Sequence, residues 1–257
     1  MLKRILVFTY GVASYAVFLF SFVYAVGFIG NVVVERSMDA PARSSFALAL
    51  AIDTLLLGVF AVQHSVMARP AFKRVITRFI PAEAERSTYV LASSLALLAL
   101  FAWWEPIGGV FWEVTSPAAR TVVHVLYAAG FGLVLYSTFL INHFDLFGLR
   151  QSWLQLVGTP YTHLPFRTPS LYRYVRHPLY VGWFVAFWST PVMTGAHLLF
   201  SAMTSAYILM AIRWEERDLV AVHGRDYERY RQEVPMLVPS VTPYQEPAAR
   251  PGETLAA

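Results

Sequence analysis

Four short polar clusters interrupt an otherwise apolar chain, and each contains side chains that can move a proton or bind a charged ligand. The clusters are Gln63 with His64, residues 142–145, Arg176 with His177, and residues 213–216. Each cluster borders a long apolar run that can cross a membrane as a helix. If these helices pack as one bundle, the clusters meet at the same end, and the sequence predicts one pocket there.

His143 and Asp145 are the first candidates for a catalytic base, acting as a pair in which the carboxylate orients the imidazole ring. Histidine suits this role because it titrates near neutral pH. His64 is the second candidate, at the same predicted depth on another helix. A simpler alternative is that both histidines only mark the membrane interface.

The stretch RYVRHPLYVGW, residues 173–183, places two arginines and a histidine directly before an apolar run. Pro178 suits the first turn of a helix, because its missing N–H costs no hydrogen bond there. His177 then lies near the helix start, where free backbone amides and Arg176 can bind a carboxylate. The plainer alternative is a juxtamembrane boundary with its cations at the lipid head groups.

Acidic and aromatic side chains complete the ligand-binding candidates. Glu215 or Glu216 can accept hydrogen bonds from ribose hydroxyls or from an ammonium group. Tyr172, Tyr174 and Tyr180 can stack on a base or attract a sulfonium through a cation–π interaction. With the anion site, these residues predict a zwitterionic, nucleotide-like ligand, although the acidic pair taken alone is more typical of a solvated helix end.

Metal, disulfide and dinucleotide sites are not predicted. His64, His143, Asp145 and His177 are competent metal ligands, but no local spacing such as HExxH links them. The chain contains no cysteine, which excludes disulfides, thiolate ligands and a cysteine nucleophile. The GFG at 130–132 lies inside an apolar run without a preceding strand, so it is not a dinucleotide fingerprint.

Membrane helices are the elements that must position these residues. The chain is 57% hydrophobic and 14% charged, and its apolar residues form blocks rather than an amphipathic pattern. A helix needs roughly 20 apolar residues to cross a ~30 Å hydrocarbon core, and a barrel would need repeated strand-like alternation instead. The blocks cover residues 5–34, 46–67, 88–104, 121–141 and 179–212. The predicted fold is therefore all-α, a polytopic membrane helix bundle.

The last block is too long for one span. As a single helix, residues 179–212 would extend about 51 Å at a rise of about 1.5 Å per residue. The block is interrupted by STPVMTGAH at 189–197, whose proline and glycine favour a break. We therefore expect four spans plus a C-terminal helical hairpin, about 178–190 and 196–213. Neighbouring helices should cover its tip, because free backbone groups cannot face lipid.

The remaining segments are expected outside the hydrocarbon core. Residues 142–177 are rich in aromatics and prolines, and they predict short interfacial helices and loops over the mouth of the bundle. The charged stretch after the hairpin predicts an interfacial amphipathic helix broken near Gly224. Residues 1–238 then form a single integral-membrane domain, and residues 239–257, with four prolines, predict a disordered tail.

Charge placement predicts the orientation in the membrane. Alternate connections put most Lys and Arg on one side, against only Arg36, Arg43 and Arg120 on the other. By the positive-inside rule the basic side is cytoplasmic, so both termini and the active site are expected there. The first block is longer than the roughly 7–15 residue apolar core of a signal peptide, which indicates a retained span. The net charge of +4 needs no nucleic-acid partner to explain it.

The C-terminal half resembles the isoprenylcysteine carboxyl methyltransferase superfamily of membrane enzymes. The resemblance rests on RHPLYVGW, then EERDL, then HGRDYERYRQEVPMLVP, over residues 170–240. It implies a binding site for S-adenosylmethionine, formed by Arg176, His177, Pro178, Tyr180, Glu215 and Glu216. Related patterns also occur in membrane sterol reductases that use NADPH, which leaves a reductase as an alternative.

The rest of the chain is similar to one branch of this superfamily, which contains NnrU-type proteins, nurim and bacterial enzymes that methylate methanethiol. The similar stretches are QHSVMARPAFK at 63–73, ERSTYVL at 85–91 and NHFDLFGLRQ at 142–151. The resemblance implies methyl transfer from S-adenosylmethionine to methanethiol, giving dimethyl sulfide and S-adenosylhomocysteine, in the bacterial inner membrane. The implied partners are a small thiol and the lipid bilayer. The alternatives are an isoprenylcysteine carboxylate or another small acceptor, or a nonenzymatic scaffold role.

Overall fold

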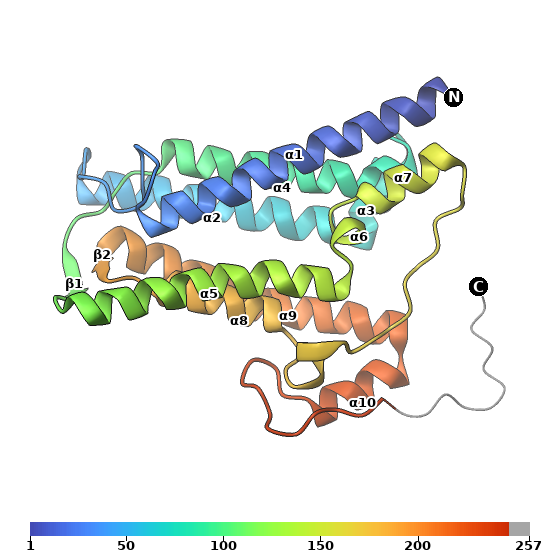
Figure 1. Cartoon of the computed structure of the whole chain (residues 1–257). Coiled ribbons are helices and arrows are strands. Elements are labelled where there is room, and N and C mark those ends of the chain that lie inside the picture. The colour runs from blue at the N-terminus through green and yellow to red at the C-terminus, as the bar shows by residue number, and fades with distance from the viewer. Residues whose placement is uncertain (247–257) are drawn as a thin grey trace.

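The structure, a computed structural model, describes residues 1–246 as a bundle of long helices (Figure 1). The long helices are α1 (Leu2–Gly30), α2 (Phe46–Ala68), α4 (Ala82–Trp103), α5 (Pro117–Ile141) and α9 (Gly195–His223), and the shorter α8 (Pro178–Trp188) lies among them. Each of the five long helices has the length and the apolar composition to cross a membrane. The predicted all-α membrane bundle is confirmed, and the protein is an integral membrane protein.

The boundaries of α4 and α9 differ most from the sequence prediction. α4 begins at Ala82 rather than at 88, because alanine and the acidic residues of its first turn favour a helix start. α9 continues through 213 to His223 as one helix, since no proline or glycine interrupts the chain before Gly224. The expected break at Gly224 is present, with a φ of 55°, and α10 (Arg225–Glu233) follows it.

Polar contacts close the turn of the predicted hairpin, which α8 and α9 form. β2 (Val192–Thr194) pairs antiparallel with β1 (Val110–Glu113), from the connection between α4 and α5. Asp39, between α1 and α2, accepts a hydrogen bond from Thr194 and lies 3.1 Å from Nδ1 of the buried His197. A strand and a loop thus cover the turn where helices were expected, and the strand pairing supplies partners for its backbone groups.

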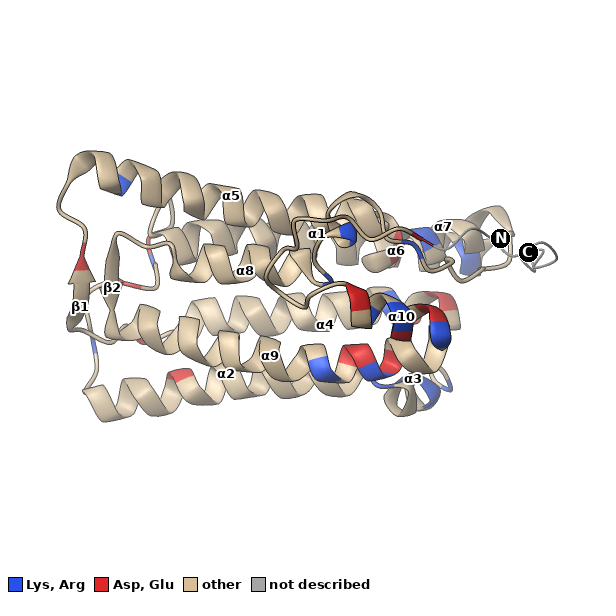
Figure 2. Ribbon diagram, turned by 90° about the horizontal axis from the view of Figure 1, so that it is seen from below, with Lys and Arg blue, Asp and Glu red and all other residues tan. Residues whose placement is uncertain are grey.

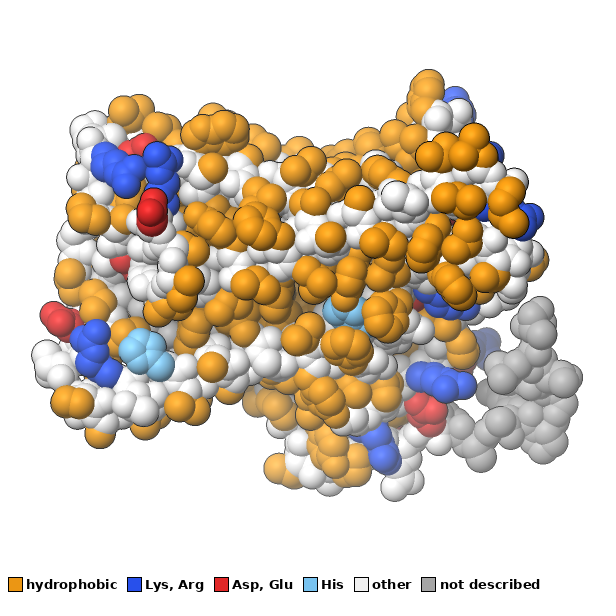
Figure 3. All heavy atoms as spheres, turned by 45° about the horizontal axis from the view of Figure 1, so that its top comes forward, with side chains coloured by type: hydrophobic (Ala, Val, Ile, Leu, Met, Phe, Trp, Pro, Cys, Tyr) orange, Lys and Arg blue, Asp and Glu red, His pale blue; other side chains and the backbone are white. Residues whose placement is uncertain are grey.

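Charged residues are concentrated at the two ends of the bundle (Figure 2). One end is rich in Lys and Arg and carries the N-terminus and the short helices. These are α3 (Pro70–Ile76), α6 (His143–Leu146), α7 (Leu149–Val157), the 3-10 helix η1 (Ser170–Arg173) and α10. Between the ends, hydrophobic side chains cover the flank shown in Figure 3. This band is where a bilayer surrounds the helices, and the candidate site residues lie at its basic end.

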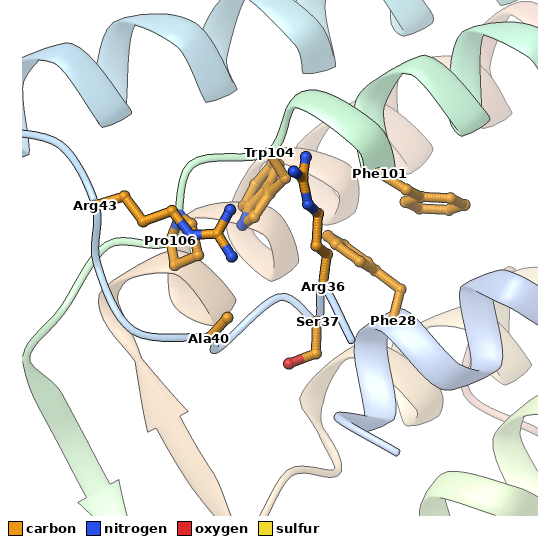
Figure 4. A pocket seen from close by; sticks show the side chains of 8 residues that line it. All are labelled: Phe28, Arg36, Ser37, Ala40, Arg43, Phe101, Trp104 and Pro106. Carbon is orange, nitrogen blue, oxygen red and sulfur yellow. The ribbon is translucent and has the colours of Figure 1, made fainter. Parts of the chain in front are cut away.

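A small hollow lies at the opposite end, between the connection of α1 to α2 and the end of α4 (Figure 4). Arg36 and Arg43 point toward Trp104 there, and Arg36 donates a hydrogen bond of 3.2 Å to the carbonyl of Ala102. The polar clusters lie at the other ends of their helices. The hollow is therefore not part of the candidate active site.

Two glycines let α5 and α8 pack closely. A Cβ on Gly130 would lie 2.6 Å from the backbone nitrogen of Ala186, and a Cβ on Gly182 would lie 2.8 Å from that of Val134. In a membrane, small residues allow helix backbones to approach, and dispersion between them drives association. This contact fixes the position of α8, and with it the position of His177 at the start of that helix.

Gly130→Ala is predicted to push α5 away from α8, because the added methyl group would overlap the backbone of Ala186. Overpacking of this kind typically costs about 1–3 kcal/mol. We expect a lower unfolding temperature for the protein purified in detergent. Gly132→Ala is the matched control on the same helix, since a Cβ there meets no atom of another described segment within 4 Å. An equal loss in both variants would contradict this account of the packing.

Candidate active site

Glu216 joins the two arms of the hairpin at the basic end of the bundle. Its Oε1 accepts a hydrogen bond of 2.7 Å from Nε of Arg176 and lies 3.0 Å from Nε2 of His177. All three side chains are nearly buried, with exposed fractions between 5% and 11%. The structure thus brings together residues that lie 40 positions apart in the chain.

Glu215, the preceding residue on α9, faces a group of tyrosines. Its Oε2 accepts a hydrogen bond of 2.7 Å from the hydroxyl of Tyr180, whereas its Oε1 has no hydrogen-bond partner among residues 1–246. Tyr172 and Tyr89 lie within electrostatic range of Glu215. A half-buried carboxylate oxygen is thus available to a ligand beside aromatic side chains.

Arg176 and Pro178 organise the start of α8. Pro178 is buried and is the first residue of α8, as the sequence predicted. Besides its bond to Glu216, Arg176 donates from Nη1 to the carbonyls of Arg231, at 2.9 Å, and Val234. The protein itself therefore engages two nitrogens of this guanidinium, so Arg176 holds the loop rather than presenting a wholly free cation.

The backbone of the same loop is fixed by the chain that follows α10. The N–H groups of Arg176 and His177 donate to the carbonyls of Pro235, at 3.0 Å, and Met236, at 3.2 Å. The GRDYERYRQEVPM stretch, which the sequence predicted to be part of an interfacial helix and of the family motif, is thus also a scaffold for the RHP loop.

Residues 239–246 belong to the segment predicted to be disordered, 239–257, and they make specific contacts in the structure. Tyr244 is buried, its N–H donates a bond of 2.7 Å to the carbonyl of Arg173, and Nε of Arg173 returns one of 2.9 Å to the carbonyl of Tyr244. Oε1 of Glu246 accepts bonds of 2.7 and 2.6 Å from the N–H and hydroxyl of Thr168. A buried aromatic ring and these bonds outweigh the proline-rich composition. Residues 247–257 lie outside the described part of the chain.

His143 lies in a closed aromatic environment at the end of α5. Its Nε2 is 2.7 Å from the hydroxyl of Tyr15, its Nδ1 is 2.8 Å from the hydroxyl of Thr138, and its ring stacks 4.2 Å from that of Phe139. The residue is only 2% exposed, and this burial lowers the pKa of His143, which favours the neutral imidazole. Its partners are on α1 and α5.

Asp145 has partners other than His143. Its Oδ1 accepts a hydrogen bond of 2.8 Å from Arg150, and its Oδ2 accepts one of 3.4 Å from the hydroxyl of Tyr161. Since Tyr15 and Thr138 occupy both ring nitrogens of His143, the carboxylate does not orient that imidazole in this structure. The expected histidine and carboxylate pair is not formed.

His64 lies where α2 packs against α4. Its Nε2 is 2.8 Å from the hydroxyl of Tyr89, and its Nδ1 is 3.2 Å from the hydroxyl of Ser93. Sequence reasoning missed both partners. A signal was present, because Arg86, Tyr89 and Ser93 recur at the spacing of one helix face.

The residues around His64 lie near those predicted to bind the cofactor. Tyr89, its hydrogen-bond partner, lies within electrostatic range of Glu215, and Tyr180 lies within that of Tyr89 and Tyr207. The structure therefore links His64, rather than His143, to the Glu215 group. Across residues 1–246, no group of three or more His, Cys, Asp or Glu is arranged to hold a metal ion.

Glu216→Gln is predicted to destabilise the hairpin, because a neutral amide leaves the nearly buried Arg176 without its counter-charge. Removing one partner of a buried ion pair typically costs about 3–5 kcal/mol. We expect a clear fall in the thermal unfolding temperature. Glu215→Gln is the matched control, since it weakens one hydrogen bond at a half-buried position, where the loss is about 1 kcal/mol. The same fall in both variants would show that Glu216 has no special structural role.

The bond between Glu246 and Thr168 predicts an acid-sensitive contribution to stability. The hydrogen bonds from Thr168 lower the pKa of Glu246 below its ordinary value. A lowered folded-state pKa stabilises the protein above the ordinary glutamate pKa of about 4.3, and this contribution is lost as the pH falls through the folded-state value. Glu246→Gln should therefore lower the unfolding temperature slightly at pH 7 and have little effect near pH 3. Glu228→Gln, on the exposed face of α10, should change neither value, and a loss at pH 3 equal to that at pH 7 would refute the linkage.

The chain is similar in sequence to a known family and to several named proteins. Residues 130–221 match the isoprenylcysteine carboxyl methyltransferase (ICMT) family. The chain is 55% identical over 240 residues to a protein of Crocosphaera subtropica named methanethiol S-methyltransferase, covering 93% of this chain and 94% of that protein. It is 52% identical over 238 residues to a Mycobacterium tuberculosis protein of the same name, covering 93% and 98%.

A more distant similarity extends to animals. The chain is 28% identical over 192 residues to nurim of Xenopus laevis, covering 70% of this chain and 66% of nurim. No solved structure shows a significant match to the chain.

Proposed function

Since this chain belongs to the methanethiol S-methyltransferase family, we propose that it transfers the methyl group of S-adenosylmethionine to methanethiol, giving dimethyl sulfide and S-adenosylhomocysteine. The observation that carries the proposal is the grouping of Tyr180, Glu215 and the surroundings of His64 at the basic end of the bundle. These residues combine a carboxylate acceptor, aromatic rings and a base. The carboxylate and the rings suit binding of the donor, and the base suits removal of the thiol proton.

The residues around Glu215 fit the methyl donor by their chemistry. The free Oε1 of Glu215 can accept hydrogen bonds from ribose hydroxyls, and the rings of Tyr172 and Tyr180 suit a sulfonium through cation–π attraction. The backbone amides of the first turn of α8 suit the donor's carboxylate. When bound, S-adenosylmethionine supplies an electrophilic methyl group.

Donor binding depends on Arg176, His177 and Glu216 mainly because they hold the other binding groups in place. Their mutual hydrogen bonds hold the start of α8 beside α9, so that the amides of α8 and the carboxylate of Glu215 face the same space. Alignment of donor and acceptor supplies much of the acceleration in a reaction of this kind.

We assign the base to His64 rather than to His143 and Asp145. A thiol must lose its proton because the thiolate is the competent nucleophile. Both histidines have hydrogen-bond partners at both ring nitrogens, but His143 is 2% exposed, whereas His64 is half-buried and its partner Tyr89 lies near the Glu215 group. The S–H proton passes to His64 and the thiolate sulfur forms a bond to the methyl carbon. The departing sulfur keeps the electron pair of the bond that breaks.

The same proposal places the site on the cytoplasmic side of a bacterial inner membrane. The end of the bundle that carries His64 and Glu215 is also the end rich in Lys and Arg. Basic residues are retained on the cytoplasmic side of membrane proteins, which supports this orientation.

Turnover by the purified protein tests the proposed function directly. The protein in detergent is incubated with methyl-labelled S-adenosylmethionine and methanethiol, and labelled dimethyl sulfide is measured by gas chromatography. We expect labelled product, together with binding of S-adenosylhomocysteine by calorimetry. Absence of product with the wild-type protein would sink the proposal.

His64→Ala is expected to lower kcat by about 100-fold or more, the usual effect of losing a general base, while S-adenosylhomocysteine still binds. Glu215→Gln should do the reverse and weaken S-adenosylhomocysteine binding first. His143→Ala and Asp145→Asn are the comparison variants, and both should keep most of the wild-type kcat once folded. If His143→Ala and Asp145→Asn lose turnover but still bind the cofactor, and His64→Ala keeps its turnover, the base is the His143 and Asp145 pair that the sequence predicted.

A further inference from the structure

We propose that the side chains of Phe60, Tyr89 and Tyr207 form the acceptor pocket and set the size of the thiol that is methylated. We call these three residues the aromatic collar. The inference rests on the proposed function and adds the specificity-determining residues of the same site. The collar comes from three helices, α2, α4 and α9, whose packing brings it together around His64.

The collar encloses the imidazole of His64 from three directions. The ring of Phe60 stacks at 5.3 Å with an angle of 28°, and the ring of Tyr89 lies at 5.1 Å. The ring of Tyr207 meets the imidazole edge-on, at 6.5 Å and 77°. All four side chains are partly buried rather than fully enclosed.

Hydrogen bonds and a cation fix the walls of the collar. The hydroxyl of Tyr207 lies 3.0 Å from that of Ser65, which ties α9 to α2. The guanidinium of Arg86 lies 5.2 Å from the ring of Tyr89, and its Nε donates a bond of 2.8 Å to the carbonyl of Leu146. The rings of Tyr89 and Tyr207 are therefore held by contacts outside the collar.

The collar faces the residues assigned to the methyl donor. Tyr207 precedes Glu215 by two helical turns on α9, a rise of about 12 Å. Tyr180, which binds Glu215, lies within electrostatic range of both tyrosines of the collar. The proposal requires that a donor bound beside Tyr180 present its methyl group toward His64 and toward the thiol within the collar.

This geometry favours the smallest alkyl thiols. Aromatic walls suit the apolar methyl group of methanethiol, and the sulfur lies against the imidazole that takes its proton. Each added methylene must displace a ring that contacts outside the collar hold in place. One methylene in such a pocket changes specificity by roughly 10–200-fold. The collar therefore predicts a steep fall in kcat/KM from methanethiol to 1-propanethiol.

Enlarging the collar tests this assignment. We expect Phe60→Ala and Tyr207→Ala each to lower the ratio of kcat/KM for methanethiol to that for 1-propanethiol by about 10-fold or more. Tyr207→Phe keeps the ring and loses only the hydroxyl contact with Ser65, so it should change the ratio much less than Tyr207→Ala does. Phe139→Ala is the matched control, because it removes the ring stacked on the other candidate base, His143. Binding of S-adenosylhomocysteine confirms that each variant is folded, and Phe60→Leu replaces any alanine variant that fails this check.

The outcomes separate this inference from the proposed function. An unchanged ratio in collar variants that still make dimethyl sulfide overturns the collar but leaves the methyl transfer intact. A shift in the ratio caused by Phe139→Ala also overturns it, because the acceptor then lies beside His143. A wild-type protein that makes no dimethyl sulfide overturns both.

Discussion

The contact of Glu216 with Arg176 and His177 is the interaction on which the rest of the site depends. It joins the start of α8 to the late part of α9, and so it closes the hairpin at the basic end of the bundle. Glu215 is the next residue on α9, and Tyr180 follows closely on α8. Their positions relative to each other are therefore set by a neighbouring ion pair that is almost excluded from water, where an unpaired charge would be costly.

The membrane imposes the second constraint. Backbone groups that face lipid must be paired, so the irregular turn of the hairpin needs a cover. A short strand pairing and Asp39 supply it, while Gly130 and Gly182 bring α5 and α8 into close contact within the band. Polar side chains that can bind a ligand or move a proton lie mainly at the basic end of the bundle. Residues from four separate helices can therefore share one site.

Two histidines that look equivalent in the sequence have different surroundings in the fold. His143 is enclosed by Tyr15, Thr138 and Phe139, which accounts for its burial and its lowered pKa. His64 is partly open and lies beside tyrosines that reach the Glu215 group. We therefore propose the reverse order of preference for the base, because the two histidines differ in exposure and in neighbours and not in residue type.

The sequence alone determined the helical membrane class, the hairpin with its break after α8, Pro178 at a helix start and the break at Gly224. These features follow from local composition and from residues that stop helices, which act over a few positions. Only the tertiary structure decided that Asp145 binds Arg150 instead of His143, that Arg176 holds the RHP loop, and that Tyr244 anchors the chain up to Glu246. It also decided that Phe60, Tyr89 and Tyr207 surround His64. Most of these contacts join residues far apart in the chain, and helix packing, which no local pattern encodes, selects among the many partners that each polar side chain could have.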